Sequence, residues 1–573
     1  MRASEILQGR RLSILIVIGV ALSVYLNTLP NGFVVDDLHQ VVDNEWIKSP
    51  SRLPEIFSSG VWDFEGRESS YYRPVMYVFY LVTYMIFGLK PWAFHLVNIL
   101  LHAAVTGLVF LFVQRICAER IPADRWYLAS PFVAAMLFAV HPIHTEAVAW
   151  IAGITDLSYS FFYLLGLTLY AFSGKGRDLF YVLSLLSYFL ALLCKEPAMT
   201  FPVILFAYEL VFSRGKSSWR IILIRLIPFC LIFLLYAGLR AWALGSLAPP
   251  VSSVTLSPSA YALNVLILFS RYMGKLVFPV NLNFWHVFKP IASLSTADSI
   301  FALLAAGICA FIVFLVRSNR PGLFASVLTV VPLAPVFVFS RMNQGIENVF
   351  TERYLYLVSA GFVLLVAEGG DWCRRRIPFG THIVAIVLAV LIVTLSIGTM
   401  QRNMVWQDSY SLWSDAARKS PESAIARMNH GYALLSQQKM NEGLVEIQEA
   451  LRLRPTLLAE KNAKGVFYAQ KGLTKKAILE FHFIIAAKPD YAPAHYNLGI
   501  LYDNKGWIDQ AIQKYEAAIK IQPDYAEAHN NLGIALARKG FKAEAVKHLK
   551  EAIRLRPTDV EFAINLDRVN HIP

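Results

Sequence analysis

Long apolar runs, separated by short polar loops, follow one another from residue 12 to residue 399. A helix of about 20 apolar residues matches the thickness of a bilayer's hydrocarbon core. The pattern therefore predicts an all-α polytopic membrane bundle with about 11–13 transmembrane helices. The runs expected to cross are 12–29, 92–113, 129–141, 157–172, 178–193, 198–213, 221–238, 299–316, 322–340, 354–370 and 380–399.

Positive charge in the loops predicts the sidedness, because basic loops stay in the cytoplasm. Keeping these loops on one side requires Pro74 to Gly88 to lie along the membrane surface and Tyr261 to Phe278 to dip in and return. If both segments crossed instead, the total would be thirteen, and the C-terminus would still be outside. The basic loops contain Arg115, Arg120, Arg125, Lys175, Arg177, Arg214, Lys216, Arg220, Arg317, Arg320, Arg374, Arg375 and Arg376.

The N-terminal run is predicted to be a membrane anchor. Arg2, Arg10 and Arg11 precede it, so the N-terminus should remain cytoplasmic. A cleaved signal peptide is the alternative, but no clear small-x-small cleavage site precedes Pro30.

A repeat of 34 residues begins after the last apolar run. Prolines 421, 455, 489, 523 and 557 are in phase, as are glycines 431, 465, 499 and 533. This period is typical of tetratricopeptide (TPR) repeats, helical pairs that stack into an α-solenoid. We predict a membrane domain over 1–401, with its first extracytoplasmic loop at 30–91. The rest is predicted as a lead-in helix over 402–421, four repeats over 422–557 and a capping helix over 558–573.

Composition supports a membrane protein and excludes other classes. The chain of 573 residues is 56% hydrophobic and only 16% charged. Its net charge of +13 lies mostly in the short loops, which argues against nucleic-acid binding. The five cysteines have no CxxC spacing, so neither a disulfide framework nor a zinc site is predicted from them.

Two adjacent carboxylates, Asp36 and Asp37, follow the first apolar run directly. A carboxylate in a partly desolvated pocket can have its pKa raised into a range useful for a general base. The alternative is an ordinary acidic loop. Their position just outside the bilayer favours chemistry on a substrate that is delivered by lipid.

A second outer loop carries His141, His144, Glu146 and Asp156. The His-x-x-His spacing is compatible with zinc, but the proline after His141 breaks the helix that would align the two rings, and no third ligand is evident. We therefore predict no metal cofactor. The favoured interpretation is a hydrogen-bonded support for the Asp36–Asp37 pair, with Asp156 near the acceptor.

Several strings in this order resemble a known family. They are Asp36-Asp37, Tyr72-Arg73-Pro74, His141-Pro-Ile-His-Thr-Glu-Ala147, Lys195-Glu196 and Glu352-Arg353-Tyr-Leu-Tyr356, followed by TPR repeats. The chain resembles the transmembrane and TPR-repeat-containing O-mannosyltransferases and, more broadly, the C-type glycosyltransferases (GT-C). The resemblance implies a polyprenyl-phosphate sugar donor and a site on the extracytoplasmic face. Four repeats are fewer than the arrays of the animal members.

A leaving phosphate develops negative charge that cations must stabilise, and guanidinium groups suit it best. Arg73, Lys195, Arg240 and Arg353 lie at the expected outer ends of spans, where snorkelling to the interface is the alternative. The predicted catalytic residues are Asp36 and Asp37. The predicted substrate-binding residues are Tyr72, Arg73, His141, His144, Glu146, Asp156, Lys195, Glu196, Arg240, Glu352 and Arg353.

We therefore predict a membrane glycosyltransferase that moves a sugar, mannose by the resemblance, from a polyprenyl phosphate to a hydroxyl, with a protein or glycan acceptor. The TPR groove is expected to hold a protein acceptor. The alternatives are a non-enzymatic membrane scaffold for envelope or polysaccharide assembly, and a glycan-to-glycan transferase. None of the asparagines begins an Asn-x-Ser/Thr acceptor, which favours a bacterial inner membrane with periplasmic repeats.

Overall fold

The computed structural model describes residues 2–66, 69–117, 127–173, 178–212, 218–246, 257–288, 307, 319–337 and 350–571. The chain divides into two compact units, residues 1–420 and residues 421–573. Each unit is described below by itself.

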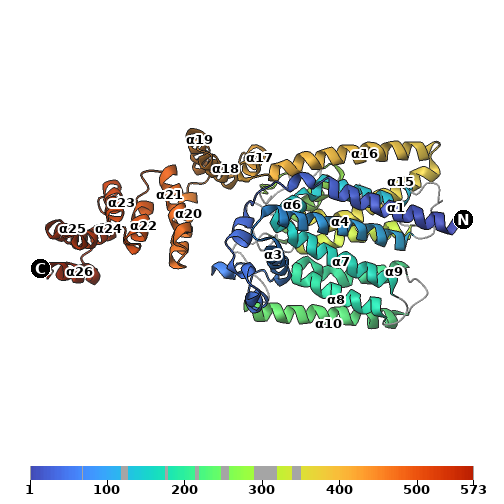
Figure 1. The fold of residues 1–573 in the computed structure, drawn as a ribbon, viewed down its shortest axis with the longest axis horizontal. Coiled ribbons are helices and arrows are strands. Elements are labelled where there is room, and N and C mark those ends of the chain that lie inside the picture. Colours follow the sequence, from blue (N-terminus) through green and yellow to red (C-terminus); the bar gives the residue numbers. More distant parts are fainter. Residues whose placement is uncertain are drawn as a thin grey trace. The chain divides into compact units, whose positions relative to one another are not determined.

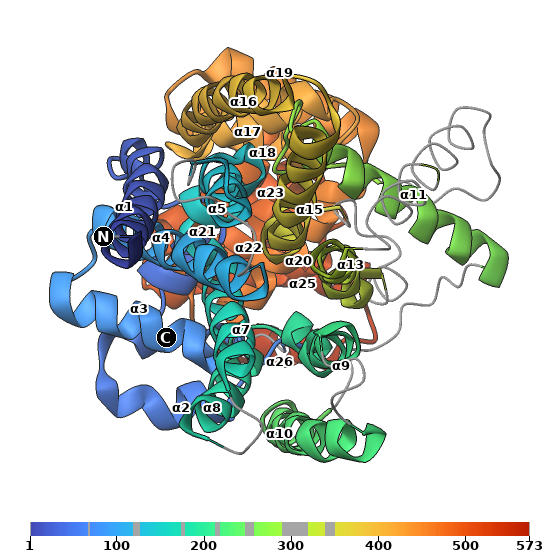
Figure 2. The ribbon, with the colours of Figure 1, turned by 90° about the vertical axis from the view of Figure 1, so that its right-hand side faces the viewer.

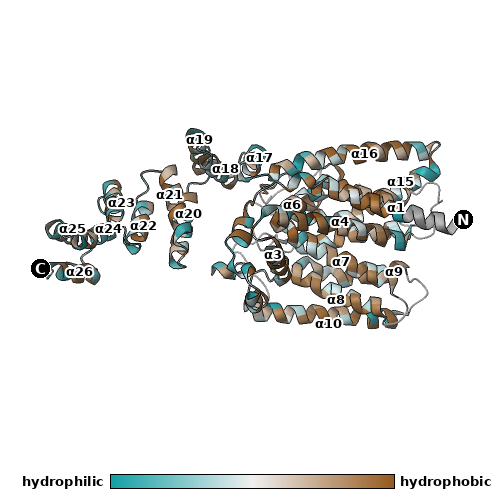
Figure 3. Ribbon diagram, in the orientation of Figure 1, coloured by the Kyte–Doolittle hydropathy of each residue, from teal (hydrophilic) through white to brown (hydrophobic). Residues whose placement is uncertain are grey.

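The first unit is a helical bundle whose long helices are apolar along their length (Figures 1 and 3). Those that belong to expected spans are α1 (Arg2–Ser23), α4 (Pro91–Ile116), α5 (Ser130–Val140), α7 (Ile154–Phe172), α8 (Leu179–Cys194), α9 (Phe201–Phe212), α10 (Trp219–Leu244), α13 (Arg320–Val330), α15 (Leu355–Arg376) and α16 (Gly380–Asn403). The remaining α-helices of this unit are α2 (Leu53–Ser58), α3 (Pro74–Phe87), α6 (Thr145–Ala149), α11 (Pro258–Val277) and α17 (Ser409–Lys419).

Every expected span inside the described residues falls on one of these helices, so the all-α membrane bundle is confirmed. Among the described residues, seven helices are long and apolar enough to cross a membrane, or up to eight if the bent pair Ser130–Val140 and Pro142–Ala149 counts as one span. The bend of 51° follows from Pro142, which removes a helical N–H. The expected span 299–316 lies outside the described residues except for residue 307, and Arg120, Arg125, Lys175, Arg177, Arg214, Lys216 and Arg317 also lie outside them.

The two amphiphilic segments, Pro74 to Gly88 and Tyr261 to Phe278, are oriented differently from the expected spans. α3 and α11 both run across the view in Figure 2, which looks along the bundle. This orientation of α3 agrees with a position along the surface. The expectation that Tyr261 to Phe278 would dip and return is wrong, because α11 is one continuous helix. Its cations Arg271 and Lys275 keep the segment too polar to count among the candidate spans.

The ends of the bundle differ in what they carry. One end holds the N-terminus and the basic last turn of α15, Arg374 to Arg376 (Figure 1). At the other end lie the segment between α1 and α3, the turn after α5, the turn after α8 and the start of α15. These four segments contain nearly all of the predicted site residues.

The second unit consists of four antiparallel helix pairs and a final helix: α18 (Ala424–Ser436), α19 (Met440–Leu453), α20 (Leu457–Gln470), α21 (Thr474–Ala487), α22 (Ala492–Asn504), α23 (Ile508–Ile521), α24 (Ala526–Arg538), α25 (Lys542–Leu555) and α26 (Val560–Asn570). The periodic glycines explain this packing. A Cβ at Gly499 would meet the Tyr515 ring at 2.6 Å, and one at Gly533 would meet Leu549 at 2.7 Å. Only glycine allows the paired helices to approach so closely.

Close helix packing in the bundle gives a matched test on α15. A Cβ at Gly361 would lie 2.6 Å from the Thr329 backbone nitrogen of α13, whereas one at Gly369 would meet nothing within 4 Å. Gly361→Ala should therefore destabilise the bundle by about 1–3 kcal/mol through overpacking. Gly369→Ala, on the same helix, should leave its stability unchanged or slightly raised. Thermal unfolding of the detergent-solubilised protein measures both, and equal midpoints would contradict the tight α13–α15 contact.

Candidate functional site

The site centres on Arg353, which links two helices at the end of the bundle opposite the N-terminus. Its Nη1 lies 2.7 Å from Glu146 Oε1, and its backbone N–H donates to Glu146 Oε2 at 3.0 Å. Its Nε lies 3.8 Å from Asp156 Oδ2. Asp156 also accepts a hydrogen bond from Lys195 Nζ at 2.5 Å. Four predicted residues from separate parts of the chain therefore form one buried ionic cluster.

A second ionic group adjoins the first. Glu196, next to Lys195, accepts from Arg73 Nη2 at 2.7 Å, and its other oxygen lies 3.5 Å from Arg240 Nη1. Arg240 also donates to the Ser70 carbonyl at 2.6 Å, which ties α10 to the segment before α3. All four predicted cations therefore pair with carboxylates inside the protein, which does not support the snorkelling alternative.

Aromatic rings cover the cations. The Arg73 guanidinium lies 4.4 Å from the centroid of Tyr71, and the Arg353 guanidinium lies 5.0 Å from the centroid of Trp150. Lys195 Nζ is 4.9 Å from the Tyr354 ring. Sequence reasoning missed these three rings as site residues. Tyr71 is adjacent in sequence to the predicted residue Tyr72, and Tyr354 lies within a quoted motif. Their closeness in sequence to predicted residues could therefore have identified these two rings.

Asp36 and Asp37 have different environments. Asp37 is buried and accepts backbone hydrogen bonds from Val34 N at 3.0 Å and from Ala152 N at 2.8 Å. Burial raises the pKa of the Asp37 carboxyl well above its usual range, an effect that Asp36 reinforces and the backbone N–H groups oppose. Asp36 is half-buried and interacts electrostatically with Arg353. Asp37 therefore fixes the loop, whereas Asp36 is the more accessible of the two carboxylates.

The turn that receives Asp37 is itself held from α4. The amide of Asn98 donates to the carbonyl of Trp150 at 2.8 Å. This contact stabilises the non-helical backbone ahead of η8 (Ile151–Gly153), where the Ala152 N–H is available for Asp37.

Tyr72, His141 and His144 lie in packed positions. The Tyr72 hydroxyl donates to the Phe57 carbonyl at 2.8 Å. His141 Nδ1 accepts from Ile143 N at 3.2 Å, and its Nε2 bonds to the Leu276 carbonyl at 3.0 Å. His144 Nε2 bonds to the Ser359 hydroxyl at 2.7 Å. Within the described ranges, no hydrogen bond or ion pair joins these three side chains to the ionic cluster, so their contacts are those of supporting residues.

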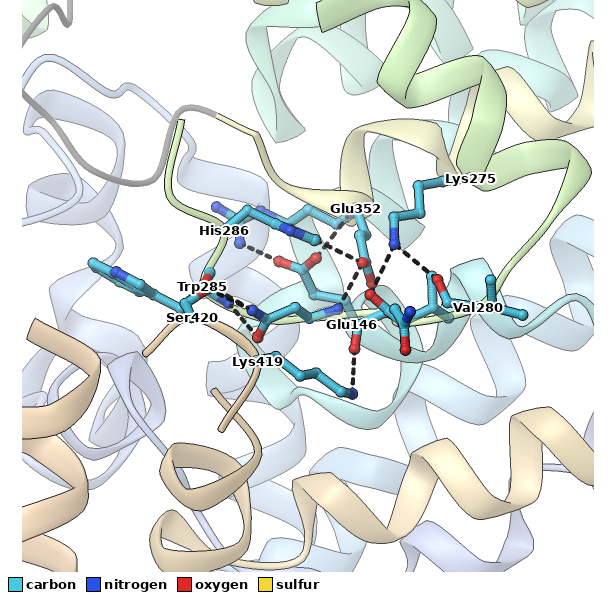
Figure 4. Close-up of polar contacts among 12 residues, drawn as sticks. Glu146, Lys275, Val280, Trp285, His286, Glu352, Lys419 and Ser420 are labelled. Atoms are coloured by element: carbon cyan, nitrogen blue, oxygen red, sulfur yellow. Dashed lines mark hydrogen bonds and ion pairs between the residues drawn. The ribbon is translucent and has the colours of Figure 1, made fainter. Parts of the chain in front are cut away.

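Glu352 anchors a neighbouring segment to the site (Figure 4). It accepts from the Asn283 N–H at 2.7 Å and from His286 Nε2 at 2.8 Å. The same segment is held at its other side by Lys419 Nζ, which donates to the Leu282 carbonyl at 2.6 Å. Glu352 thus positions residues 281–286 beside Arg353.

The charge balance of the site suits an incoming anion. Four cations face three carboxylates and Asp36. Burial lowers the pKa of Lys195 to about 8, with help from Arg353 and Arg73 and against the opposing charge of Asp156. Burial would raise the pKa of Glu196, but Arg73 and Arg240 outweigh it and hold that pKa below its usual range.

Comparisons with known proteins agree with the fold and the motifs. Residues 504–540 match a family model described as TPR repeat, and residues 526–559 match one described as tetratricopeptide repeat. The human protein O-mannosyl-transferase TMTC3 is 27% identical over 526 residues, which cover 84% of this chain and 55% of that protein. The Caenorhabditis elegans protein O-mannosyl-transferase F38B6.6 is 27% identical, with 78% of this chain and 64% of that protein covered.

Solved structures match only weakly. A crystal structure of YrrB, a TPR protein with an unusual peptide-binding site, is 19% identical and covers 32% of this chain and 91% of its own, with a TM-score of 0.19. Nothing below rests on this match.

The fold and the matches define an all-α integral membrane protein with a C-terminal TPR solenoid. Over most of its length it is similar to the protein O-mannosyl-transferases named above, which confirms the resemblance inferred from the motifs. The chain spans about half the length of the first of these relatives.

The pKa of Lys195 predicts a pH dependence for anion binding. Because that pKa is lowered, the ammonium form is lost as pH rises through about 8. Affinity for a phosphodiester anion, which keeps one negative charge throughout, should then fall about tenfold or more, the worth of one charge-assisted hydrogen bond. In the Lys195→Arg variant, this fall in affinity with rising pH should be absent. Equilibrium binding to the purified protein from pH 6 to pH 10 measures it, and identical profiles for both proteins would contradict a role of Lys195 in anion binding.

Proposed function

We propose that this chain transfers a sugar from a polyprenyl-phosphate donor to a hydroxyl group on a protein. The observation that carries the proposal is the buried ionic cluster of Arg73, Lys195, Arg240 and Arg353 beside Asp36, all at one end of a membrane bundle. The printed names of the relatives support mannose as the sugar and protein as the acceptor.

The cations suit the phosphate of the donor. Arg73 and Arg353 are the more accessible ones, with side chains 16% and 22% exposed, against 4% for Lys195. A phosphodiester that entered from the bilayer would meet these two guanidinium groups first, and Lys195 behind them would add a third charge. Guanidinium forks stabilise the negative charge that grows on the leaving phosphate.

Asp36 is the general base of the proposed reaction. Its carboxylate takes the proton of the acceptor hydroxyl as the hydroxyl oxygen forms a bond to the anomeric carbon. The bond from that carbon to the phosphate oxygen breaks, and the polyprenyl phosphate leaves with the bonding electrons. A single displacement of this kind inverts the anomeric centre. Arg353 holds Asp36 near the phosphate through charge.

The proposed location is a bacterial inner membrane, with the site and the TPR repeats on the periplasmic side. The basic last turn of α15 at the opposite end of the bundle supports this sidedness. A reporter that is active only outside the cytoplasm, fused after Pro573, should be active, and one fused after Lys175 should be silent. Swapped results would reverse the proposed topology.

The two adjacent carboxylates give the sharpest test of the base. Asp36→Asn should lower turnover by roughly a hundredfold or more, the contribution of general-base catalysis, with little effect on folding. Asp37→Asn should instead lower the midpoint of thermal unfolding, because it weakens two backbone hydrogen bonds. Turnover and unfolding of both variants are measured in the same preparation. Wild-type turnover in a folded Asp36→Asn protein would contradict the proposed base.

Removal of the solenoid distinguishes an enzyme from a scaffold. The cut belongs after Ser420, because Asp415 of α17 pairs with Arg402 and Ser420 bonds to Asn283, all within the first unit. The truncated protein should still bind and hydrolyse the donor, whereas transfer to a protein acceptor should fall about a hundredfold or more through the lost effective concentration. A scaffold would bind no phosphosugar lipid in either form.

A further inference from the structure

A second group of ionisable side chains lies in the same outer segment and takes no part in the proposed transfer. His39, Asp43 and Glu65 each offer one ligand atom, and the three atoms lie within 4.8 Å of one another. His39 Nδ1 is 2.9 Å from Glu65 Oε1 and 3.9 Å from Asp43 Oδ2. Ligands of a tetrahedral zinc ion, each about 2.1 Å from the metal, are about 3.4 Å apart, which falls between these two distances.

The backbone of two short helical turns brings the three side chains together. His39 lies in the π-helical turn η2 (Leu38–Val42) and Asp43 caps its end, so that these two side chains, four residues apart, face the same side. Glu65 ends the short helix η5 (Asp63–Glu65), which Gly66 closes in the left-handed conformation. A π-helical turn interrupts regular hydrogen bonding and occurs frequently at functional sites.

The charges of the group favour a divalent cation. Two carboxylates and one imidazole nitrogen converge, and an anionic set of donors of this kind binds divalent cations. The Glu65 side chain is only 2% exposed, so its surroundings hold this ligand in place. The Asp43 side chain is 39% exposed, which leaves a path for the ion and room for water as a further ligand.

The ligand types indicate which ion. One imidazole nitrogen and two carboxylate oxygens suit zinc with a water molecule in the fourth position, whereas calcium and magnesium prefer oxygen alone. His141, the other histidine considered for zinc from sequence, engages both of its ring nitrogens in hydrogen bonds to the backbone.

We propose that His39 Nδ1, Asp43 and Glu65 form a divalent-cation site, with zinc as its best match. The ion would join the turn that follows Asp36 and Asp37 to the η5 segment, and so fix the loop that carries the two carboxylates. Its role would be to hold structure and position, and the proposal does not depend on what reaction the chain catalyses.

Metal titration of the whole chain tests the site. The protein is purified in detergent with an affinity tag other than polyhistidine, stripped with a chelator, and titrated with Zn²⁺ by elemental analysis and with Co²⁺ by visible absorption. The wild type should bind one equivalent more than His39→Gln or Glu65→Gln, and its unfolding midpoint should rise with Zn²⁺. Binding equal to that of the wild type in both variants, or no binding by the wild type, would overturn the proposal.

Controls and a milder variant complete the test. Glu55→Gln removes an exposed carboxylate of the same loop, which pairs with Arg52 at 2.7 Å, and should bind metal like the wild type. His548→Gln removes a close pair of histidines in the repeats, where His529 Nδ1 and His548 Nδ1 are 3.0 Å apart, and should also leave the site intact. If the buried variants do not fold, Asp43→Asn serves instead, and it should weaken zinc affinity at least tenfold. Unchanged affinity there would equally contradict the site.

Discussion

The outer end of the bundle depends on the mutual compensation of buried charges. Glu146, Asp156, Glu196, Lys195 and the three arginines come from five separate parts of the chain, and each would be costly to bury alone. Their pairing therefore acts as a set of cross-links that can form only when the helices are correctly assembled.

Sequence periodicity was sufficient for the architecture because both units are built from repeated local rules. Apolar length predicted the spans, and the 34-residue phase predicted the helix pairs with their glycine contacts, as at Gly499 against Tyr515. The failure at Tyr261 to Phe278 has a physical reason. Loop charge constrains only the parity of crossings, and a continuous helix such as α11 that lies across the bundle satisfies that parity as well as a re-entrant loop does.

The candidate site could be predicted in membership but not in role. Arg73, Lys195 and Arg353 were predicted to lie on one side of the membrane, because of their positions relative to the spans and because of the quoted motifs. The sequence could not predict that Asp36 and Asp37 have different environments. The difference arises because the Ala152 N–H, far along the chain, donates a hydrogen bond to Asp37 and not to Asp36. The aromatic cover from Trp150 was also beyond reach, since cation–π contacts depend on tertiary placement and leave no spacing signal.

The turn between the paired helices of each repeat affects how the number of repeats in such a chain can increase. Gly472, Gly506 and Gly540 adopt φ values of +73°, +77° and +87°, and Gln438 adopts φ 63° at the equivalent place in the first pair. A non-glycine residue holds this conformation only at a cost, so the first pair departs from the pattern of the other three. Duplication of a whole 34-residue module copies the favourable turn together with its glycine contacts, so new length can arise by recombination among the later modules, without any change in the membrane bundle.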